Sequence, residues 1–287
     1  MDNIIVVNKD KDYTSRDVVN VIGKIFNTKK VGHTGTLDPL ATGVLIVCMN
    51  KALKVVDLIT ASDKEYIAKV VLGIDTDTLD ITGNIINECR TNVTVDMVKS
   101  ALNSFIGKSI QEVPKYSAVK VNGKKLYEYA RNGIDVELPK REIQIFDIEL
   151  ISDIDIVDGH QEFSFRVKVS KGTYIRSLIR DIGVKLGCFA FMKELTRTKQ
   201  GKFSIDESYT LNDIKNGNYK LLNIKDVIDI EKVVVSDNML FKIKNGMILD
   251  KFFISDKSLI LDNKGNEIGI YKTYDKDSNK VKPDKIF

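Results

Sequence analysis

Residues 32–43 read GHTGTLDPLATG, and the apolar run VLIVCM follows directly at residues 44–49. Glycines and an Asp-Pro pair interrupt helices and strands, and the residue before a proline is driven towards an extended conformation. The stretch therefore predicts a loop that presents Asp38 at the entrance to a buried strand. Loops anchored on strands often carry functional side chains, whereas an aspartate in a turn can equally cap the backbone. Taken alone, these residues leave both interpretations of Asp38 open.

The composition bounds the class of protein. The chain has 287 residues, of which 43% are hydrophobic, so it can form one large domain or one large and one small domain. No run approaches the roughly 18 apolar residues that a membrane span needs, and the N-terminus lacks the features of a signal peptide. Cys48, Cys89 and Cys188 are scattered and odd in number, which favours a reduced, cytoplasmic compartment. His33 and His160 form no cluster with zinc-ligand spacing, so we expect no metal.

Basic residues are concentrated rather than spread evenly. The net charge is only +4, yet residues 162–202 carry ten Lys or Arg against three acids, and residues 146–161 carry five acids and no Lys or Arg. Such a block suits a phosphate-rich ligand, although a solvated surface would have the same composition. A second cluster mixes cations with aromatic rings, which favours RNA; it comprises Lys115, Lys120, Lys124, Lys125 and Arg131 with Tyr116, Tyr127 and Tyr129.

Hydrophobic periodicity predicts a mixture of helices and strands. Thr14 and Asp17 resemble a capping box ahead of a helix that reaches residue 26. Further helices are predicted near residues 52–59, 98–105 and 175–186, and strands at 4–7, 44–49, 66–72, 143–151 and 162–169. The order shows no regular βαβ repeat, so we expect an α+β domain with a largely antiparallel sheet. A boundary is predicted near residue 230, followed by a small β-rich appendage.

A second group of candidate site residues follows the strand at 162–169. Lys171 and Gly172 turn the chain, Thr173 is a candidate N-cap, and Tyr174 and Arg176 fall in the first turn of the next helix. A helix N-terminus favours anions, and an arginine there can bind a carboxylate or phosphate through two bonds. A surface ion pair is the alternative.

Tyr66 stands at the head of the strand at 66–72. Side-chain alternation puts it on the same face as Ala68, Val70 and Leu72. That is the ordinary position of a core aromatic, so the strand alone does not distinguish packing from function.

Five segments together resemble the tRNA pseudouridine synthase B (TruB) family. They are residues 32–43, 64–66, 113–131, 171–178 and 195–197, which occur in family order within residues 4 to 200. The resemblance implies an α+β pseudouridine synthase fold with a central, mainly antiparallel mixed sheet flanked by helices. It also implies a catalytic domain over residues 1–230, with an RNA-gripping thumb at about 114–140, and a small PUA-like RNA-binding domain over 231–287.

The resemblance also implies an activity. Family members isomerise uridine 55 in the TΨC arm of tRNA to pseudouridine, with no cofactor and no metal, and we expect a cytoplasmic monomer whose partner is tRNA. Asp38 would be the catalytic carboxylate, Tyr66 would pack against the target base, and Arg176 would pair with Asp38. The residues implied for substrate and RNA binding are His33, Lys9, Lys64, Tyr174, Leu195 and Arg197.

The chemistry is compatible with one carboxylate. The reaction breaks the N1–C1′ bond, turns the base over and joins C5 to C1′, and a carboxylate can act there as nucleophile or base. The base must first leave its stack for a pocket. A tRNA-binding folding chaperone with vestigial catalysis is the alternative function. A guide-RNA-dependent relative is a third possibility, but such proteins have larger C-terminal parts.

Three positions depart from the family pattern. The family usually has proline after the lysine of its opening loop and glycine two positions further on, where this chain has Asp10 and Asp12 after Lys9. Lys115 stands where a second proline is common, which concerns the thumb. The tail after residue 230 matches weakly.

Overall fold

One large mixed sheet is formed by strands that lie between Ile4 and Ser204. The computed structural model describes residues 3–287. The central path of the sheet runs β1 (Ile4–Lys9), β3 (Thr42–Met49), β13 (Ala190–Gln200), β4 (Lys64–Leu72), β12 (His160–Val169), β10 (Lys140–Leu150) and β7 (Gly107–Glu112). Three short strands pair at its margins: β2 (Val31–His33), β11 (Asp155–Val157) and β14 (Phe203–Ser204). Within this sheet the strand pairs are antiparallel apart from β13 and β3, so the predicted mainly antiparallel α+β fold is confirmed.

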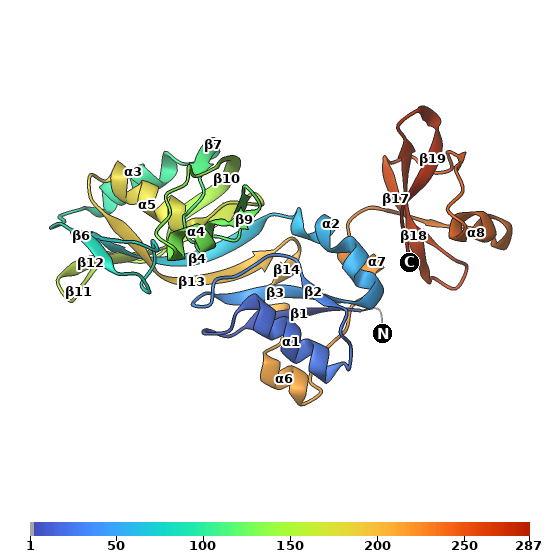
Figure 1. Ribbon diagram of the computed structural model, residues 1–287, viewed down its shortest axis with the longest axis horizontal. Coiled ribbons are helices and arrows are strands. Elements are labelled where there is room, and N and C mark those ends of the chain that lie inside the picture. The colour runs from blue at the N-terminus through green and yellow to red at the C-terminus, as the bar shows by residue number, and fades with distance from the viewer. Residues whose placement is uncertain (1–2) are drawn as a thin grey trace.

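Helices cover the sheet in two places (Figure 1). Helices α3 (Val95–Asn103) and α5 (Ile175–Lys185) bury Leu102, Leu178 and Ile182 against apolar side chains of β4, β10, β12 and β13. Helices α1 (Ser15–Ile25) and α6 (Leu211–Lys215) instead pack against β1 and β3. The predicted capping box is present, since the Thr14 hydroxyl accepts from the Asp17 N–H and the Asp17 carboxylate accepts from the Thr14 N–H.

Two expectations about local structure needed correction. The segment predicted as one helix at 52–59 begins as a 3₁₀ helix, Asn50–Val55, and continues as the short helix α2 (Val56–Thr60). Strand β13 was not predicted although it lies in the middle of the sheet. Bulges between Met192 and Glu194 and between Arg197 and Lys199 shift its alternation, and this removes the period-two signal by which a strand is found in sequence.

The connection from β7 to β10 contains most of the segment predicted as the thumb at about 114–140. The name thumb is used below for residues 113–138 of this connection, which contain β8 (Lys120–Val121), β9 (Lys124–Lys125) and α4 (Leu126–Arg131). A hairpin of β5 (Ile74–Thr76) and β6 (Ile85–Glu88) lies beside it. Both segments line one cavity together with α5.

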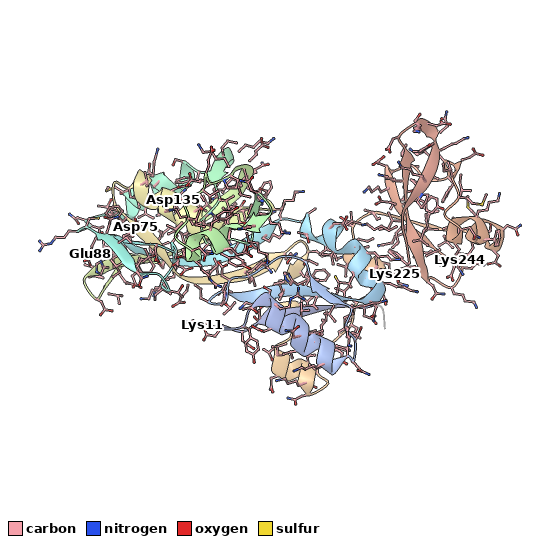
Figure 2. All side chains as sticks on the ribbon, viewed as in Figure 1. Lys11, Asp75, Glu88, Asp135, Lys225 and Lys244 are labelled. Atoms are coloured by element: carbon pink, nitrogen blue, oxygen red, sulfur yellow. The ribbon has the colours of Figure 1, made fainter. Side chains whose placement is uncertain are left out.

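A second, five-stranded sheet forms the C-terminal end. Its order is β15 (Glu231–Val234), β17 (Lys257–Leu261), β18 (Glu267–Tyr274), β19 (Asp277–Ile286) and β16 (Leu249–Asp250), with α8 (Asp237–Lys244) against it. Leu259 and Ile270 from this sheet share an apolar cluster with Ile4 and with Ile224 of α7 (Ile224–Val227). Lys225, labelled at this junction in Figure 2, donates to the Gly265 carbonyl at 2.9 Å.

The division of the chain at residue 230, and the PUA-like character of residues 231–287, stay predictions. No helix within residues 3–287 combines the length and apolar character needed to cross a bilayer.

Candidate active site

A carboxylate and a guanidinium face each other where two loops leave the sheet. Asp38 lies in the loop before β3, and Arg176 lies in the first turn of α5. Arg176 Nε is 2.9 Å from Asp38 Oδ2, and Arg176 Nη2 donates to Asp38 Oδ1 at 3.2 Å. The arginine side chain is 6% exposed and that of Asp38 33% exposed, so the carboxylate alone faces solvent. The two-bond pair holds the carboxylate in one orientation while leaving it open to a ligand.

Arg176 also joins three separate segments of the chain. It donates to the Thr78 carbonyl in the β5–β6 turn and to the Tyr116 carbonyl in the thumb, both at 3.0 Å. Its Nη1 is 3.6 Å from Asp80 Oδ2, and the Asp80 side chain is 6% exposed. Each nitrogen of the guanidinium is thereby engaged, so the side chain is fixed in place.

Asp80 is a site residue that the sequence analysis missed. Its Oδ1 accepts from the Thr78 hydroxyl at 2.8 Å and from the Thr82 N–H at 3.0 Å, which anchors the turn between β5 and β6. A signal was present in the spacing Thr78-x-Asp80-x-Thr82, because an aspartate between hydroxyl residues is typical of a hydrogen-bonded turn. Nothing in that pattern indicates that its other oxygen faces Arg176.

The start of α5 differs from the expectation. The predicted N-cap, Thr173, instead donates its hydroxyl to the Ser170 carbonyl, and the cap position falls on Tyr174. Gly172, with φ of 83°, makes the predicted turn, in a conformation that favours glycine. Arg176 is therefore in the first turn as predicted, one residue after the helix begins.

Most of the predicted site residues line one hollow beside Asp38. A depression of about 260 Å³ is lined by Asp38, Lys64, Tyr66, Tyr174, Arg176, Leu195 and Arg197. Tyr66 is 8% and Leu195 7% exposed, so the depression has an apolar floor next to a carboxylate. Burial raises the pKa of the Tyr174 hydroxyl, which keeps it neutral at pH 7.

Lys64 enters this depression from β4. Its ammonium donates to the Thr60 and Ser62 carbonyls at 2.6 and 2.5 Å. Burial and, less strongly, the nearby Arg197 charge lower its pKa to about 8. Lys64 is still predominantly a cation at pH 7 and can offer positive charge to an anionic ligand.

Lys9 does not have the surface position expected of an RNA contact. It is fully buried, and its ammonium donates to the carbonyls of Asp10, Tyr13 and Pro39. Burial lowers its pKa to about 8. The expected contact between Lys9 and RNA stays a prediction; in this structure the side chain fastens the Asp38–Pro39 turn to β1.

Arg197 is also buried, although it lines the depression at Asp38. It is 1% exposed, and it donates to the Val44 carbonyl at 2.6 Å and the Gly35 carbonyl at 3.2 Å. Gly43, opposite Arg197 in the parallel pair, has φ of 98°, and a Cβ there would lie 2.2 Å from the Arg197 carbonyl oxygen. Arg197 therefore holds the loop from below and presents little surface to RNA.

The opening loop, which follows β1 and contains Asp10 and Asp12, is still bonded to the Asp38 loop. Asp12 adopts a φ of 68°, a left-handed conformation for which glycine is the usual residue. Its N–H donates to the Pro39 carbonyl at 2.8 Å, the same carbonyl that Lys9 contacts. Asp12 thus occupies a glycine-type position without displacing the loop.

His33 lies at the end of β2 and lines a neighbouring depression of about 590 Å³ that also reaches Asp38 and Arg176. Burial lowers its pKa, and the charges of Arg197 and Arg16 lower it further. Its Nδ1 accepts from the Gly35 N–H at 3.3 Å, so the neutral ring carries its proton on Nε2. His33 is thus suited to contact a ligand as a neutral donor.

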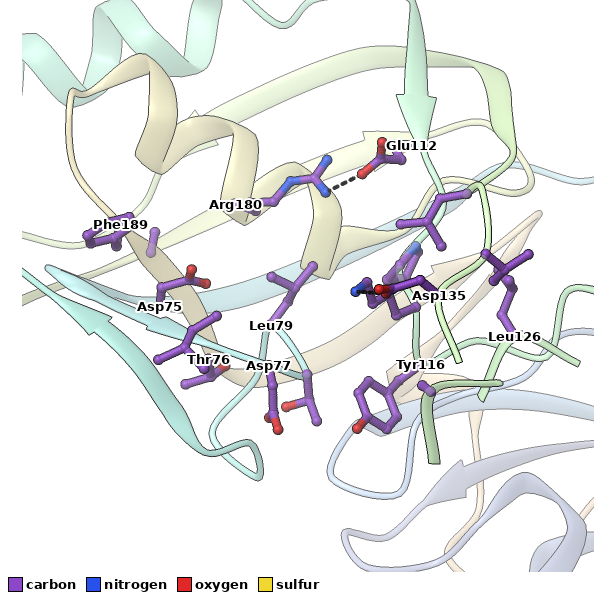
Figure 3. Close-up of a pocket in the computed structure, with 18 of the residues that line it drawn as sticks. Asp75, Thr76, Asp77, Leu79, Glu112, Tyr116, Leu126, Asp135, Arg180 and Phe189 are labelled. Carbon is purple, nitrogen blue, oxygen red and sulfur yellow. Dashed lines mark hydrogen bonds and ion pairs between the residues drawn. The ribbon is translucent and has the colours of Figure 1, made fainter. Parts of the chain in front are cut away.

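A further cavity, of about 530 Å³, lies between the thumb, the β5–β6 hairpin and α5. Figure 3 shows Leu79, Tyr116 and Asp135 around it and the Arg180–Glu112 ion pair above it. Thr78 and Tyr116 line both this cavity and the larger depression at Asp38. Their carbonyls are the ones that bind Arg176, so the wall between the two hollows is fixed by the arginine.

Within residues 3–287, no group of three or more His, Cys, Asp or Glu side chains has an arrangement that could hold a metal ion. The three cysteines in that range are free thiols. The chemistry that the arrangement itself supports is that of an oriented carboxylate beside an apolar, aromatic floor.

Comparison with known proteins gives consistent matches over nearly the whole chain. Residues 23–175 match the family described as TruB family pseudouridylate synthase (N terminal domain), and residues 176–234 match the tRNA pseudouridylate synthase B C-terminal domain. A protein from Staphylococcus saprophyticus, named tRNA pseudouridine synthase B, is 44% identical over 99% of this chain and 98% of its own length. A protein of that name from Bacillus subtilis is 39% identical over 100% of this chain and 97% of its own.

Solved structures agree with the fold. A Cbf5–Nop10–Gar1 complex contains a chain with a TM-score of 0.70 and 27% identity, covering 94% of this chain and 78% of that one. An H/ACA RNP bound to a substrate RNA containing 2′-deoxyuridine contains a chain with a TM-score of 0.69 and 26% identity, covering 99% and 84%. With the first family match spanning residues 23–175 and relatives at 44% and 39% identity over nearly the full length, the chain belongs to the TruB family of pseudouridylate synthases.

Proposed function

We propose that this protein converts uridine 55 in the TΨC arm of tRNA to pseudouridine and that Asp38 is its catalytic carboxylate. The observation that carries the proposal is the two-bond pair between Asp38 and the buried Arg176, at 2.9 and 3.2 Å, at the edge of a hollow floored by Tyr66 and Leu195. The names of the relatives, tRNA pseudouridine synthase B, supply the substrate class.

Asp38 performs the chemistry at the sugar. Its carboxylate attacks C1′ as a nucleophile or removes a proton from the sugar, and the N1–C1′ bond breaks. After the base has rotated, C5 bonds to C1′ as the Asp38–C1′ bond breaks, or as the sugar regains its proton from Asp38. Asp38 then assists removal of the proton from C5, and N1 takes up a proton. Arg176 holds the carboxylate in one orientation through its two bonds to Asp38. The reaction is an isomerisation with no net oxidation, so its balance needs no co-reactant.

The hollow accommodates a base that has left the helix stack. Tyr66 and Leu195 supply aromatic and apolar surface against which the base packs, while Lys64 supplies positive charge for a nearby phosphate. His33 contacts neighbouring nucleotides from the adjoining depression. In this proposal the protein acts as a monomer in the cytoplasm, and the thumb closes over the RNA.

The test is a single-turnover assay on an unmodified tRNA transcript with pseudouridine mapped chemically. We expect product at position 55 with the wild-type protein and a loss of more than about 10³-fold with Asp38→Asn, which is isosteric but cannot act as nucleophile or base. Asp10→Asn, an exposed neighbour in sequence of Lys9, is the matched control and should keep full activity.

Two outcomes would contradict the proposal. Product at another position would overturn the site of modification, and full activity of Asp38→Asn would overturn the mechanism. A protein that remodels tRNA without forming product would instead favour the folding-chaperone function.

A further inference from the structure

Gln111 is the one buried residue of strand β7, and the three residues that precede it are exposed. It is the fifth residue of β7, and its exposure is 3%, whereas the preceding Ile110 is 65% exposed. An edge strand that exposes an isoleucine and buries an amide reverses the usual pattern. A buried amide is stable only when its donor and acceptor are both satisfied, so the partners of Gln111 identify its role.

Both partners belong to one residue at the start of α5. Gln111 Nε2 donates to the Tyr174 carbonyl at 3.0 Å, and its Oε1 accepts from the Tyr174 N–H at 2.8 Å. Tyr174 is the N-cap of α5, and its own side chain makes no capping bond within the described structure. The amide of a distant strand therefore fixes the residue where the helix begins.

The next residue of β7 strengthens the same attachment. The Glu112 carbonyl accepts from the Ser177 hydroxyl at 2.9 Å, and the Glu112 carboxylate pairs with Arg180 at 2.9 Å (Figure 3). These contacts all lie within the first two turns of α5. Arg176, which holds Asp38, projects from the segment that they fix.

We propose that Gln111 is a positioning residue: its amide clamp on the Tyr174 backbone sets where Arg176 and Tyr174 stand relative to Asp38. This inference rests on the proposed function. Without the clamp, the first turn of α5 loses the bonds that fix its cap residue, and the guanidinium moves relative to the carboxylate. A displacement of about 1 Å at reacting groups can lower a rate by about 10²-fold.

The chain contains a matched control. Gln161 makes the same two-bond clamp on the Val93 backbone, with both bonds at 2.8 Å. Its target is the segment before α3, which does not line either depression at Asp38. Gln161→Met and Gln111→Met therefore remove the same chemical groups, but only the second removes them from the helix that carries Arg176.

The experiment measures single-turnover rate and RNA affinity for both variants on the unmodified tRNA transcript. We expect Gln111→Met to lower the rate by about 10- to 100-fold with the Kd for RNA within about twofold. Gln161→Met should keep its rate within about twofold, while its melting temperature falls by an amount similar to that of Gln111→Met.

A second variant tests the clamp through pH. In Gln111→Glu the protonated carboxyl can donate to the Tyr174 carbonyl and accept from its N–H, whereas the ionised carboxylate repels the carbonyl. Burial raises the pKa of such a carboxyl. The rate of Gln111→Glu relative to wild type should therefore rise as the pH falls from about 8 to about 6, and the relative rate of Gln111→Met should stay flat.

Four outcomes would overturn the inference, and a fifth would contradict the proposed function instead. The inference is overturned if Gln111→Met keeps a wild-type rate, if its rate and RNA affinity fall together, or if Gln161→Met is equally impaired. The inference is also overturned if the rate of Gln111→Glu relative to wild type does not rise at low pH. If Gln111→Met does not fold, the pH series of Gln111→Glu decides alone. Absence of product with the wild-type protein would instead contradict the proposed function.

Discussion

The two segments that meet at Arg176 are held in different ways. The Asp38 loop, residues 32–41, has its backbone carbonyls bound by side chains that come from β1, α1 and β13 and are themselves 0–2% exposed: Lys9, Ser15, Arg197 and Gln200. The thumb, residues 113–138, is held mainly by contacts within itself. Its Lys115–Asp135 ion pair is 59% and 98% exposed, and the Tyr129 hydroxyl binds the Val121 carbonyl of the same segment.

The difference separates a fixed half of the site from an adjustable half. Buried donors from three elements over-determine the Asp38 loop, so the carboxylate is oriented before any ligand arrives. Exposed ion pairs and local turns contribute little to stability, and the Arg176–Tyr116 bond ties the thumb to the rest of the site. We expect the thumb to move on RNA binding and the loop to stay in place.

The largest effect is expected where the two segments meet. Arg176→Lys keeps a positive charge but cannot make the two-bond contact to Asp38 and the carbonyl contacts together. We expect the single-turnover rate to fall by about 10²- to 10³-fold. Arg180→Lys, one turn further along α5, is the control and should change the rate by less than about threefold. A small effect of Arg176→Lys would mean that activity does not require one residue to bind both the Asp38 loop and the thumb.

A smaller effect is expected when Lys9, the buried lysine that holds the Asp38 loop, is replaced. The pKa of Lys9 is lowered from 10.5 to about 8 in the folded protein, so the unfolded chain binds more protons between these values. The wild-type free energy of unfolding should therefore rise with pH across this window. Lys9→Met lacks this titrating group. The difference in free energy of unfolding between wild type and Lys9→Met should therefore change by about 1–3 kcal/mol across this pH window.

Urea titrations at both ends of the window measure this difference. Lys11, labelled in Figure 2, is an exposed lysine in the loop that directly follows Lys9, and Lys11→Met is the matched control. A pH dependence that Lys9→Met leaves unchanged would contradict the assignment of Lys9 as a buried fastener.

The opening loop offers a gain of stability. Asp12 has a φ of 68°, which glycine adopts without the steric cost of a Cβ. Asp12→Gly should raise the free energy of unfolding by about 0.5–1 kcal/mol, and Asp12→Ala should lower it. Thermal melts of the three proteins measure the order. If glycine destabilises the loop, the Asp12 side chain supports it in a way that its conformation does not show.

The smallest effect is expected on the thumb. Asp135→Asn removes the exposed partner of Lys115 and should change the free energy of unfolding by less than about 0.5 kcal/mol. Chemical denaturation at low and high salt measures it. A loss as large as that expected for Lys9→Met would show that the thumb is held as firmly as the Asp38 loop.

Sequence reasoning found the residues with strong local signals. The Asp38 loop, the helix that carries Arg176 and the mainly antiparallel α+β fold follow from glycines, helical spacing and alternation, and the family motifs connected them. Strand β13 escaped because its bulges break the alternation. Asp80 and Gln111 escaped because a lone aspartate in a turn or a lone glutamine on a strand has no distinctive pattern.

The roles of Lys9 and Arg197 show where the limit lies. Both are cations that the family resemblance assigns to RNA binding, and the sequence does not show whether they are buried. Their position below the Asp38 loop arises because β1, β3 and β13 are neighbours in the sheet, which is a long-range property of the fold.

The sequence by itself determined which residues are candidates for the site and which segments form loops, because glycine, proline and periodicity act over a few positions. The tertiary structure alone decided which of those side chains are exposed beside Asp38 and which are buried supports. That distinction depends on burial and on hydrogen-bond partners more than 100 residues apart, as with Asp38 and Arg176, separated by 138 positions. Such contacts arise only when the sheet brings distant strands together.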